Sequence, residues 1–192
     1  FPVSYFPLMS RTSQSHPIEV AFISPSAHSW PGRLGLTFAP GKKADSLYGE
    51  PWDRDLSTDL KRLREKFGVD LLCPLLEEAE FTALGIPTLR EDAFALGMLV
   101  HHLPIPDTEA PDDIVAFDTC ISAAIEALKA GQAVVFHCKG GLGRAGTLTA
   151  AVLIAGGTSP EAAVAAVRTA RPGAVETHEQ EQFLRKLSAN CG

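Results

Sequence analysis

The stretch "VVFHCKGGLGRAGT", residues 134–147, decides the fold and raises the question of what its cysteine does. The β-branched and aromatic residues at its start predict a short buried strand, and the alanine- and leucine-rich sequence after Arg144 predicts a helix. Three glycines between them allow a tight loop. Because unpaired amides and the helix dipole both favour negative charge at a helix start, the loop is predicted to bind an anion.

Short apolar segments alternate with segments of helical periodicity along the rest of the chain. We expect strands over residues 18–23, 36–38, 69–76, 98–105 and 132–137. We expect helices over residues 57–67, 88–97, 111–130 and 160–170, from the glycine loop to 154, and from 177 onward. Four of these helices have a recognisable start: a cap at Ser57, a capping box of Thr88 with Glu91, a cap at Ser159 followed by Pro160, and a capping box of Thr177 with Gln180. The alternation predicts an α/β fold, in which helices flank a central, mostly parallel sheet and the glycine loop joins the last core strand to a helix.

The composition argues against several classes of function. The chain has 17 basic and 23 acidic residues and a net charge of −6, which disfavours binding to nucleic acid or anionic membranes. We find neither an apolar run of the ~20 residues that a membrane span needs nor a secretory signal. The four cysteines match neither a disulfide framework nor a zinc site, so we expect no metal and a reducing, cytoplasmic location. We also expect an irregular arm over residues 1–17 and a single domain over 18–192.

Cys138 and Arg144 enclose five residues, a length that can curl around one tetrahedral anion. Amide dipoles and a helix start would favour the thiolate of Cys138, and the planar guanidinium of Arg144 can clamp two phosphate oxygens. Together these groups predict phosphoryl transfer to cysteine. The alternative is a buried core cysteine before an ordinary turn, which leaves unexplained the three glycines at a helix entrance and His137 before the cysteine.

The residues "HCKGGLGR" resemble the H-C-x5-R phosphate-binding loop of the cysteine-dependent protein tyrosine phosphatase superfamily. The wider pattern "HHLPIPDTEAPDD", then "VVFHCKGGLGRAGT", then "RPGAVETHEQEQFL" resembles the small dual-specificity phosphatases, in particular the kinase-associated type. The resemblance is strong over residues 98–187 and traceable from about residue 35. It implies a phosphatase-type catalytic domain that hydrolyses phosphate monoesters through a phosphocysteine intermediate, without a cofactor.

By this resemblance Cys138 is the nucleophile and Arg144 clamps the phosphate. The phosphate-binding residues are those of the loop, namely Lys139, Gly140, Gly141, Leu142, Gly143 and Arg144. Asp107 in "PIPD" falls at the general-acid position, where it would protonate the leaving oxygen and then deprotonate the hydrolytic water. An ordinary turn aspartate is the alternative. Asp112 and Asp113 compete for the role, but the start of a helix explains them better.

The resemblance gives three further residues supporting roles, each with a structural alternative. His137 would lie behind the loop and help to keep the thiolate by hydrogen bonding, which a buried core histidine can also do. Gln180 would orient the hydrolytic water, although it is equally explained as the capping-box partner of Thr177. Cys73 could form a reversible disulfide with Cys138, but we favour a buried, apolar-like cysteine.

One position departs from the family pattern. Ala145 stands where the family usually has a serine or threonine whose hydroxyl stabilises the leaving thiolate when the phosphoenzyme breaks down. The hydroxyl of Thr147 is two residues further along the predicted helix and is expected to point elsewhere. The second chemical step is therefore expected to be slow.

Two lysines, Lys42 and Lys43, follow Gly41 in a predicted turn. We interpret them as ordinary solvated residues. The alternative is that they belong to a positive rim that attracts a phosphorylated substrate.

These observations favour an active phosphatase that acts on phosphotyrosine, with phosphoserine and phosphothreonine left open as further substrates. The alternative is a catalytically slow pseudophosphatase that binds phosphorylated partners, for which Ala145 is the only support. A rhodanese-like sulfur carrier or an arsenate reductase also uses a loop cysteine, but Asp107 and the spacing to Arg144 argue against both. We expect a phosphorylated protein or peptide as the partner, no nucleic acid, no membrane, and a monomer.

Overall fold

The computed structural model describes residues 10–45 and 50–189. A five-stranded sheet lies at its centre, with the strands in the order β1-β2-β7-β5-β6. β1 runs antiparallel to β2, whereas the other neighbouring strands are parallel, which confirms the predicted class. The strands of this sheet are β1 (Ala21–Phe22), β2 (Arg33–Phe38), β5 (Val69–Pro74), β6 (Leu99–Val100) and β7 (Ala133–Cys138). A separate antiparallel pair is formed by β3 (Lys43–Ala44) and β4 (Trp52–Asp53).

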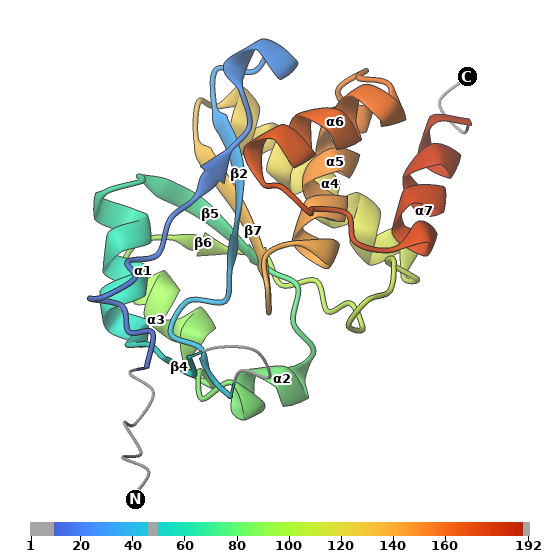
Figure 1. Ribbon diagram of the computed structural model, residues 1–192. Coiled ribbons are helices and arrows are strands. Elements are labelled where there is room, and N and C mark those ends of the chain that lie inside the picture. The colour runs from blue at the N-terminus through green and yellow to red at the C-terminus, as the bar shows by residue number, and fades with distance from the viewer. Residues whose placement is uncertain (1–9, 46–49, 190–192) are drawn as a thin grey trace, which may run out of the picture.

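Helices cover both faces of the five-stranded sheet (Figure 1). On one side lie α1 (Leu56–Glu65) and α3 (Leu89–Ala95), and on the other lie α4 (Ile114–Lys129), α5 (Gly143–Ala155), α6 (Pro160–Ala170) and α7 (His178–Ala189), while α2 (Glu78–Ala83) lies beyond the lower edge of the sheet in this view. A short 3-10 helix spans Pro25–Ala27. Apolar side chains on each side form a separate core, and successive residues of β7 point alternately into the two. All six residues of β7 are buried, because this strand lies between two parallel neighbours and under helices on both faces.

Two of the predicted helix starts are confirmed in detail. Ser159 caps α6 by accepting a hydrogen bond from the N–H of Ala162, and Pro160 follows in the first turn. At α7 the N–H of Gln180 donates to the hydroxyl of Thr177, while the Gln180 side-chain oxygen accepts from the N–H of Thr177. This reciprocal pair is the capping box that the sequence predicts.

Other predicted boundaries are wrong for local reasons. α1 begins one residue earlier than expected, because Asp55 rather than Ser57 caps it by accepting from the N–H of Thr58. The hydroxyl of Thr88 donates to the carboxylate of Asp92 and caps no backbone amide, so no capping box forms with Glu91. The expected strand over 98–105 is regular only over Leu99–Val100, and α4 begins at Ile114 instead of 111. The sequence analysis did not predict α2.

A buried ion pair ties the β3–β4 hairpin to α1. The guanidinium of Arg54 contacts both carboxylate oxygens of Asp59 at 2.7 and 2.8 Å, and neither side chain is more than 1% exposed. Asp59 also accepts the N–H of Gly41, and Arg54 donates to the carbonyl of His16. Because a buried charge needs a partner, these contacts hold the turn after β2, the hairpin and the N-terminal segment together.

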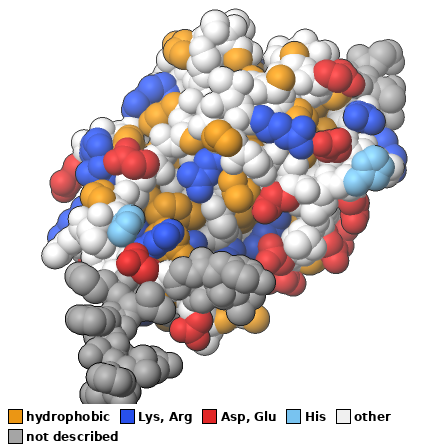
Figure 2. All heavy atoms as spheres, viewed as in Figure 1, with side chains coloured by type: hydrophobic (Ala, Val, Ile, Leu, Met, Phe, Trp, Pro, Cys, Tyr) orange, Lys and Arg blue, Asp and Glu red, His pale blue; other side chains and the backbone are white. Residues whose placement is uncertain are grey.

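The described residues carry charges of both signs at the surface. On the face drawn in Figure 2, Lys and Arg side chains are interspersed with Asp and Glu side chains and with hydrophobic groups. Among the helices of residues 10–45 and 50–189, none is long and apolar enough to cross a membrane.

Candidate active site

Cys138 is the last residue of β7, the central strand of the sheet. In the strand register it lies beside Phe38 of β2, and the preceding residue lies beside Pro74 of β5. The segments that follow three parallel strands therefore meet around one point, as is usual for the carboxyl edge of such a sheet. The thiol is only 4% exposed, and the N–H of Gly141 donates to its sulfur at 3.2 Å.

The carbonyl groups of the loop are all bound by donors outside it. Two of these donors are cationic side chains. Lys42 Nζ lies 3.2 Å from the carbonyl oxygen of Lys139, and the Arg171 guanidinium donates to the carbonyls of Gly140 and Gly141. The pairs are Lys42 and the N–H of Ala39 with Lys139, Arg171 with Gly140 and Gly141, the N–H groups of Val175 and Gly146 with Leu142, and the hydroxyl of Thr147 with Gly143. In a planar trans peptide the next residue's N–H points away from the carbonyl, so the N–H groups of residues 140–144 line the inner side. These are the N–H groups that the sequence predicts to bind an anion, and the binding of phosphate by residues 139–144 stays a prediction.

Two of the loop glycines differ in what they require. Gly141 has φ +72°, and a Cβ there would lie 2.5 Å from the backbone carbonyl of Thr37. Gly140 has no atom within 4 Å of the place of its Cβ. Position 141 therefore requires glycine, both because of its positive φ and because a Cβ would clash with the neighbouring backbone, whereas position 140 does not.

Arg144 lies in the first turn of α5 and is 1% exposed. Its two terminal nitrogens bind the two carboxylate oxygens of Glu80 at 2.6 and 2.9 Å, and one of them also donates to the carbonyl of Ile105. Burial opposes the charge, but the bond to Glu80 and the nearby Cys138 raise the pKa of Arg144 above its usual value. Its Nε is buried without a partner among the described residues, so this edge of the guanidinium remains able to bind an oxyanion.

Of the three candidate aspartates, Asp107 is the one that lines the cleft at Cys138. Its Oδ1 lies 3.0 Å from the Arg144 guanidinium, and its side chain is 58% exposed. Asp113 instead caps α4 through the N–H of Ala116, and Asp112 accepts the N–H of Asp113. The side chains of Asp112 and Asp113 are thus both engaged at the start of α4, as the sequence predicts.

The cleft has a volume of about 350 Å³. The turn after β2 and the β3–β4 pair form one wall, and the Asp107 loop and Glu176 form the other. Its lining residues are Lys42, Ala44, Asp45, Trp52, Asp107, Thr108, Cys138, Lys139, Gly140 and Glu176. The interpretation of Lys42 as solvated is wrong, because it is 7% exposed, whereas Lys43 is exposed as expected and pairs with Asp53.

His137 is fully buried directly before the nucleophile. Burial lowers its pKa to about 3, so the ring is neutral at physiological pH. Neither ring nitrogen has a hydrogen-bond partner among the described residues. The hydrogen bond through which this ring was predicted to support the thiolate is therefore not present among the described residues, and the role of His137 stays a prediction.

Gln180 is fully buried, and both ends of its amide are occupied. Its oxygen accepts from the N–H groups of Glu176 and Thr177, and its Nε2 donates to the carbonyl of Glu109 at 3.1 Å. The side chain thus links the start of α7 to the Asp107 loop. The orientation of a hydrolytic water by Gln180 stays a prediction.

The start of α7 holds the Asp107 loop at a second point. The hydroxyl of Thr177 donates to the carbonyl of Thr108, whose φ is +70°. A β-branched residue rarely adopts this conformation, so the backbone next to Asp107 is strained and held by its contacts.

Cys73 lies on β5 beside Phe136 and is fully buried. Its thiol is paired with that of Cys120 on α4, and burial raises the pKa of the Cys73 thiol. Cys73, Cys120 and Cys138 are all unbridged. A disulfide between Cys73 and Cys138 stays a prediction.

The hydroxyl of Thr147 donates to the carbonyl of Gly143 at 2.8 Å. It is therefore occupied by the loop backbone, as its place in the helix predicts. Ala145 is completely buried and offers no hydroxyl at the position where the family usually has one.

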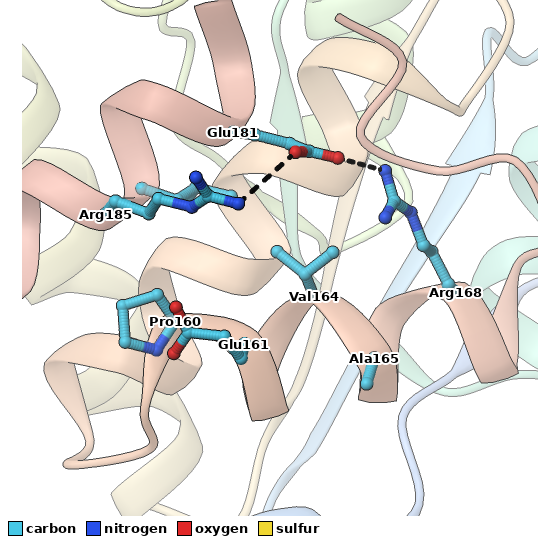
Figure 3. Close-up of a pocket in the computed structure, with 8 residues that line it drawn as sticks. Pro160, Glu161, Val164, Ala165, Arg168, Glu181 and Arg185 are labelled. Atoms are coloured by element: carbon cyan, nitrogen blue, oxygen red, sulfur yellow. Dashed lines mark hydrogen bonds and ion pairs between the residues drawn. The ribbon is translucent and has the colours of Figure 1, made fainter. Parts of the chain in front are cut away.

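A further network holds the segment behind the loop (Figure 3). Arg168 donates to the carbonyls of Ala174 and Val175 and pairs with Glu181, which also pairs with Arg185. Figure 3 shows these side chains beside a cavity of about 310 Å³ between α6 and α7. The network fixes Val175, whose φ is +58° and whose N–H binds the loop.

Sequence reasoning missed Glu80 because it lies on α2, a helix that was not predicted. The spacing of Glu77 and Glu80 was the available signal. These two residues form a capping box at the start of α2, in which each side chain accepts from the backbone of the other.

We predict that Gly141→Ala destabilises the protein by ~1–3 kcal/mol, because the new Cβ meets the Thr37 backbone in an unfavourable conformation. Gly140→Ala is the matched control and should change stability by less than ~0.5 kcal/mol. Urea unfolding of both variants measures the difference. Equal losses in the two variants would contradict this description of the loop.

Comparison with known proteins agrees with this geometry. A family model described as "Polymorphic toxin system, DSP-PTPase phosphatase" matches residues 48–158. Cyclin-dependent kinase inhibitor 3 of Sus scrofa is 28% identical over 175 residues, which cover 89% of this chain and 79% of the relative. A probable protein tyrosine phosphatase type IVA A of Dictyostelium discoideum is 37% identical over 97 residues, covering 50% and 57%.

A solved structure of kinase associated phosphatase, in which serine replaces the catalytic-site cysteine, superimposes with a TM-score of 0.82 at 26% identity. The superposition covers 91% of this chain and 96% of that one. The fold, the loop geometry and these likenesses lead to one assignment: the chain belongs to the dual-specificity protein tyrosine phosphatases, a family of phosphomonoester hydrolases, and is similar to kinase associated phosphatase.

Proposed function

We propose that this protein removes phosphate from phosphorylated proteins, phosphotyrosine among their residues, through a phosphocysteine formed on Cys138. The observation that carries the proposal is the loop backbone: the carbonyls of residues 139–143 are bound by groups outside the loop, which leaves the N–H groups of residues 140–144 on the other side of the peptides. These donors converge beside a buried thiol and a buried guanidinium. Fixed donors of this kind stabilise the negative charge of a transferring phosphoryl group.

In the first step the Cys138 thiolate attacks phosphorus, and the bond from phosphorus to the leaving oxygen breaks. The electron pair of that bond goes to the oxygen, which takes a proton from Asp107. In this proposal the loop amides and the unpartnered Nε of Arg144 hold the phosphoryl oxygens throughout.

In the second step water attacks the phosphocysteine, and Asp107 takes the proton that the water loses. The bond between sulfur and phosphorus breaks, the thiolate leaves, and inorganic phosphate is released. No metal is needed, because Arg144 and the amides supply the electrostatic stabilisation.

The names of the relatives and the chemistry of the thiolate support the substrate class and the location. The matched relatives are named as kinase-associated and tyrosine phosphatases, which supports a phosphorylated protein as the partner. A thiolate nucleophile needs a reducing environment, which supports the cytoplasmic location expected from the sequence.

A pseudophosphatase that binds phosphorylated partners is the second candidate, and Ala145 is the observation that favours it. The two candidates differ in turnover but not in binding.

We expect Cys138→Ser to abolish hydrolysis of p-nitrophenyl phosphate while phosphate binding survives, because a hydroxyl is a far weaker nucleophile and the loop amides are unchanged. Activity of the unmodified protein should persist in a chelator. Cys120→Ala, which removes a buried thiol outside the cleft lining, is the control and should keep its activity. Full activity of Cys138→Ser would contradict the cysteine mechanism.

Asp107→Asn should lower kcat by roughly 10²–10⁴, the usual contribution of general acid–base catalysis. The loss should be smaller on substrates with good leaving groups, and the basic limb of the pH profile should flatten. Steady-state kinetics on aryl phosphates of graded leaving-group acidity measure both effects. Asp112→Asn is the matched control, since Asp112 bonds only its neighbour's amide. If that variant shows the loss and Asp107→Asn does not, the assignment of the acid is wrong.

Ala145→Ser should raise the steady-state rate, because the added hydroxyl can stabilise the thiolate as the phosphoenzyme breaks down. Rapid mixing of the unmodified protein with an aryl phosphate should show a phenol burst near one equivalent, followed by slow turnover. The serine variant should show a smaller burst. Absence of a burst in both proteins, with equal rates, would show that another group already supplies this donor.

A further inference from the structure

The carboxylate of Asp107 is held by an ion pair and a hydrogen bond, not by packing. Residues 107–109 are all exposed. Asp107 Oδ1 lies 3.0 Å from the Arg144 guanidinium and accepts the N–H of Thr108 at 3.1 Å. No hydrogen bond from the described residues reaches Oδ2, which leaves this oxygen to carry the proton that Asp107 would transfer. The Thr108 N–H is thus one of the two groups that set the direction of the carboxylate.

Thr108 has a backbone conformation that its side chain disfavours. Its φ is +70°, in the left-handed region that a β-branched residue rarely adopts. The two backbone dihedrals of Thr108 set the direction of its N–H relative to its own carbonyl group. If the residue relaxed to a negative φ, its N–H would turn away from Asp107 Oδ1. Such a strained residue keeps its conformation only where the surrounding structure holds it.

Two side chains at the start of α7 hold the backbone directly after Asp107. The hydroxyl of Thr177 donates to the carbonyl of Thr108 at 3.2 Å, and Nε2 of Gln180 donates to the carbonyl of Glu109 at 3.1 Å. Figure 1 shows the chain entering α7 beside the loop that precedes α4. Of the two bonds, the one from Thr177 reaches the strained residue itself. It fixes the Thr108 carbonyl, and with it the direction of the N–H that Asp107 accepts.

We propose that Thr177 is a positioning residue for the general acid. Its bond to the Thr108 carbonyl keeps Thr108 in the left-handed conformation, and the Thr108 N–H in turn directs the Asp107 carboxylate into the cleft. Thr177 is not among the described residues that line this cleft, so it acts through the loop and not on the substrate. The inference rests on the proposed function, since it concerns the proton that Asp107 would give to the leaving oxygen.

The same hydroxyl also caps α7, so the test has to separate the two roles. Thr177 Oγ1 accepts the N–H of Gln180, which is the cap, and donates to the Thr108 carbonyl, which is the bond to the loop. Loss of a cap lowers the stability of a helix whatever the substrate. Loss of the bond to the loop should instead slow the steps in which Asp107 transfers a proton.

The test is the dependence of kcat/KM on the leaving group, measured with phenyl phosphate and p-nitrophenyl phosphate. This ratio reports the first chemical step, so slow breakdown of the phosphocysteine does not affect it. Thr177→Val removes the hydroxyl at nearly the same side-chain volume. It should lower kcat/KM for phenyl phosphate by about 5-fold, the loss that goes with one hydrogen bond. The value for p-nitrophenyl phosphate should change by less than about 2-fold, because this leaving group needs little protonation.

Three further variants separate positioning from capping. Thr177→Asp keeps a cap, since aspartate accepts the helix N–H, but it has no donor for the Thr108 carbonyl and should show the same selective loss. Thr177→Ser keeps the hydroxyl and should match the unmodified protein on both substrates. Ser159→Ala removes the cap of α6 and should leave the ratio of the two kcat/KM values unchanged. Thermal unfolding of each variant establishes that it is folded.

The outcomes distinguish this inference from the proposed function. If Asp107→Asn loses activity mainly on phenyl phosphate, whereas the folded Thr177 variants without a donor lose none or lose equally on both substrates, the positioning role is overturned and the proposed function stands. Weaker inhibition by inorganic phosphate in Thr177→Val would also overturn it, because the carbonyls of residues 139–143 bind other groups. If the unmodified protein has no phosphatase activity, or Asp107→Asn shows no selective loss, the assignment of the acid fails and this inference fails with it.

Discussion

The outward hydrogen bonds of the phosphate loop are the constraint on which the rest of the site depends. Five consecutive carbonyls, from residue 139 to residue 143, accept from groups in the turn after β2, in α5 and in the segment 171–175. Because each peptide is planar, fixing the carbonyl outside also fixes the next N–H inside. The loop is thus held in one conformation by the rest of the chain, and the binding of the proposed phosphate would not have to order it.

The segments that supply these donors are themselves held by charged side chains, of which Arg54 and Asp59 are buried and Arg168 is exposed. The Arg54–Asp59 pair fixes the turn that carries Lys42, and Arg168 fixes the carbonyls next to the Val175 amide. Glu80, which lies on α2, holds the Arg144 guanidinium through both of its carboxylate oxygens. Since breaking the buried Arg54–Asp59 pair leaves an uncompensated charge, this pair couples the stability of the fold to the geometry of the site.

The parts of the site that could be predicted are those formed by residues close together in the sequence. The strand, the loop and α5 are contiguous, and the caps of α6 and α7 involve residues three apart, so their patterns are visible in one window. Glu80 lies 64 positions from Arg144 on a helix of six residues, too short to show periodicity. The burial of Lys42 depends on Phe38 and Trp52, which meet only when the hairpin folds back. A turn with two lysines shows nothing of this in the sequence, which is why Lys42 was wrongly interpreted as solvated.

The central claim is that phosphate passes through the sulfur of Cys138, and direct detection of that intermediate tests it. The protein is mixed with an excess of an aryl phosphate, denatured within milliseconds, and digested for peptide mapping by mass spectrometry. The account predicts one phosphoryl group on the peptide that contains Cys138 during turnover, and none on that peptide once substrate is exhausted. Turnover with the phosphoryl group on another residue, or with no phosphorylated peptide at all, would contradict the account.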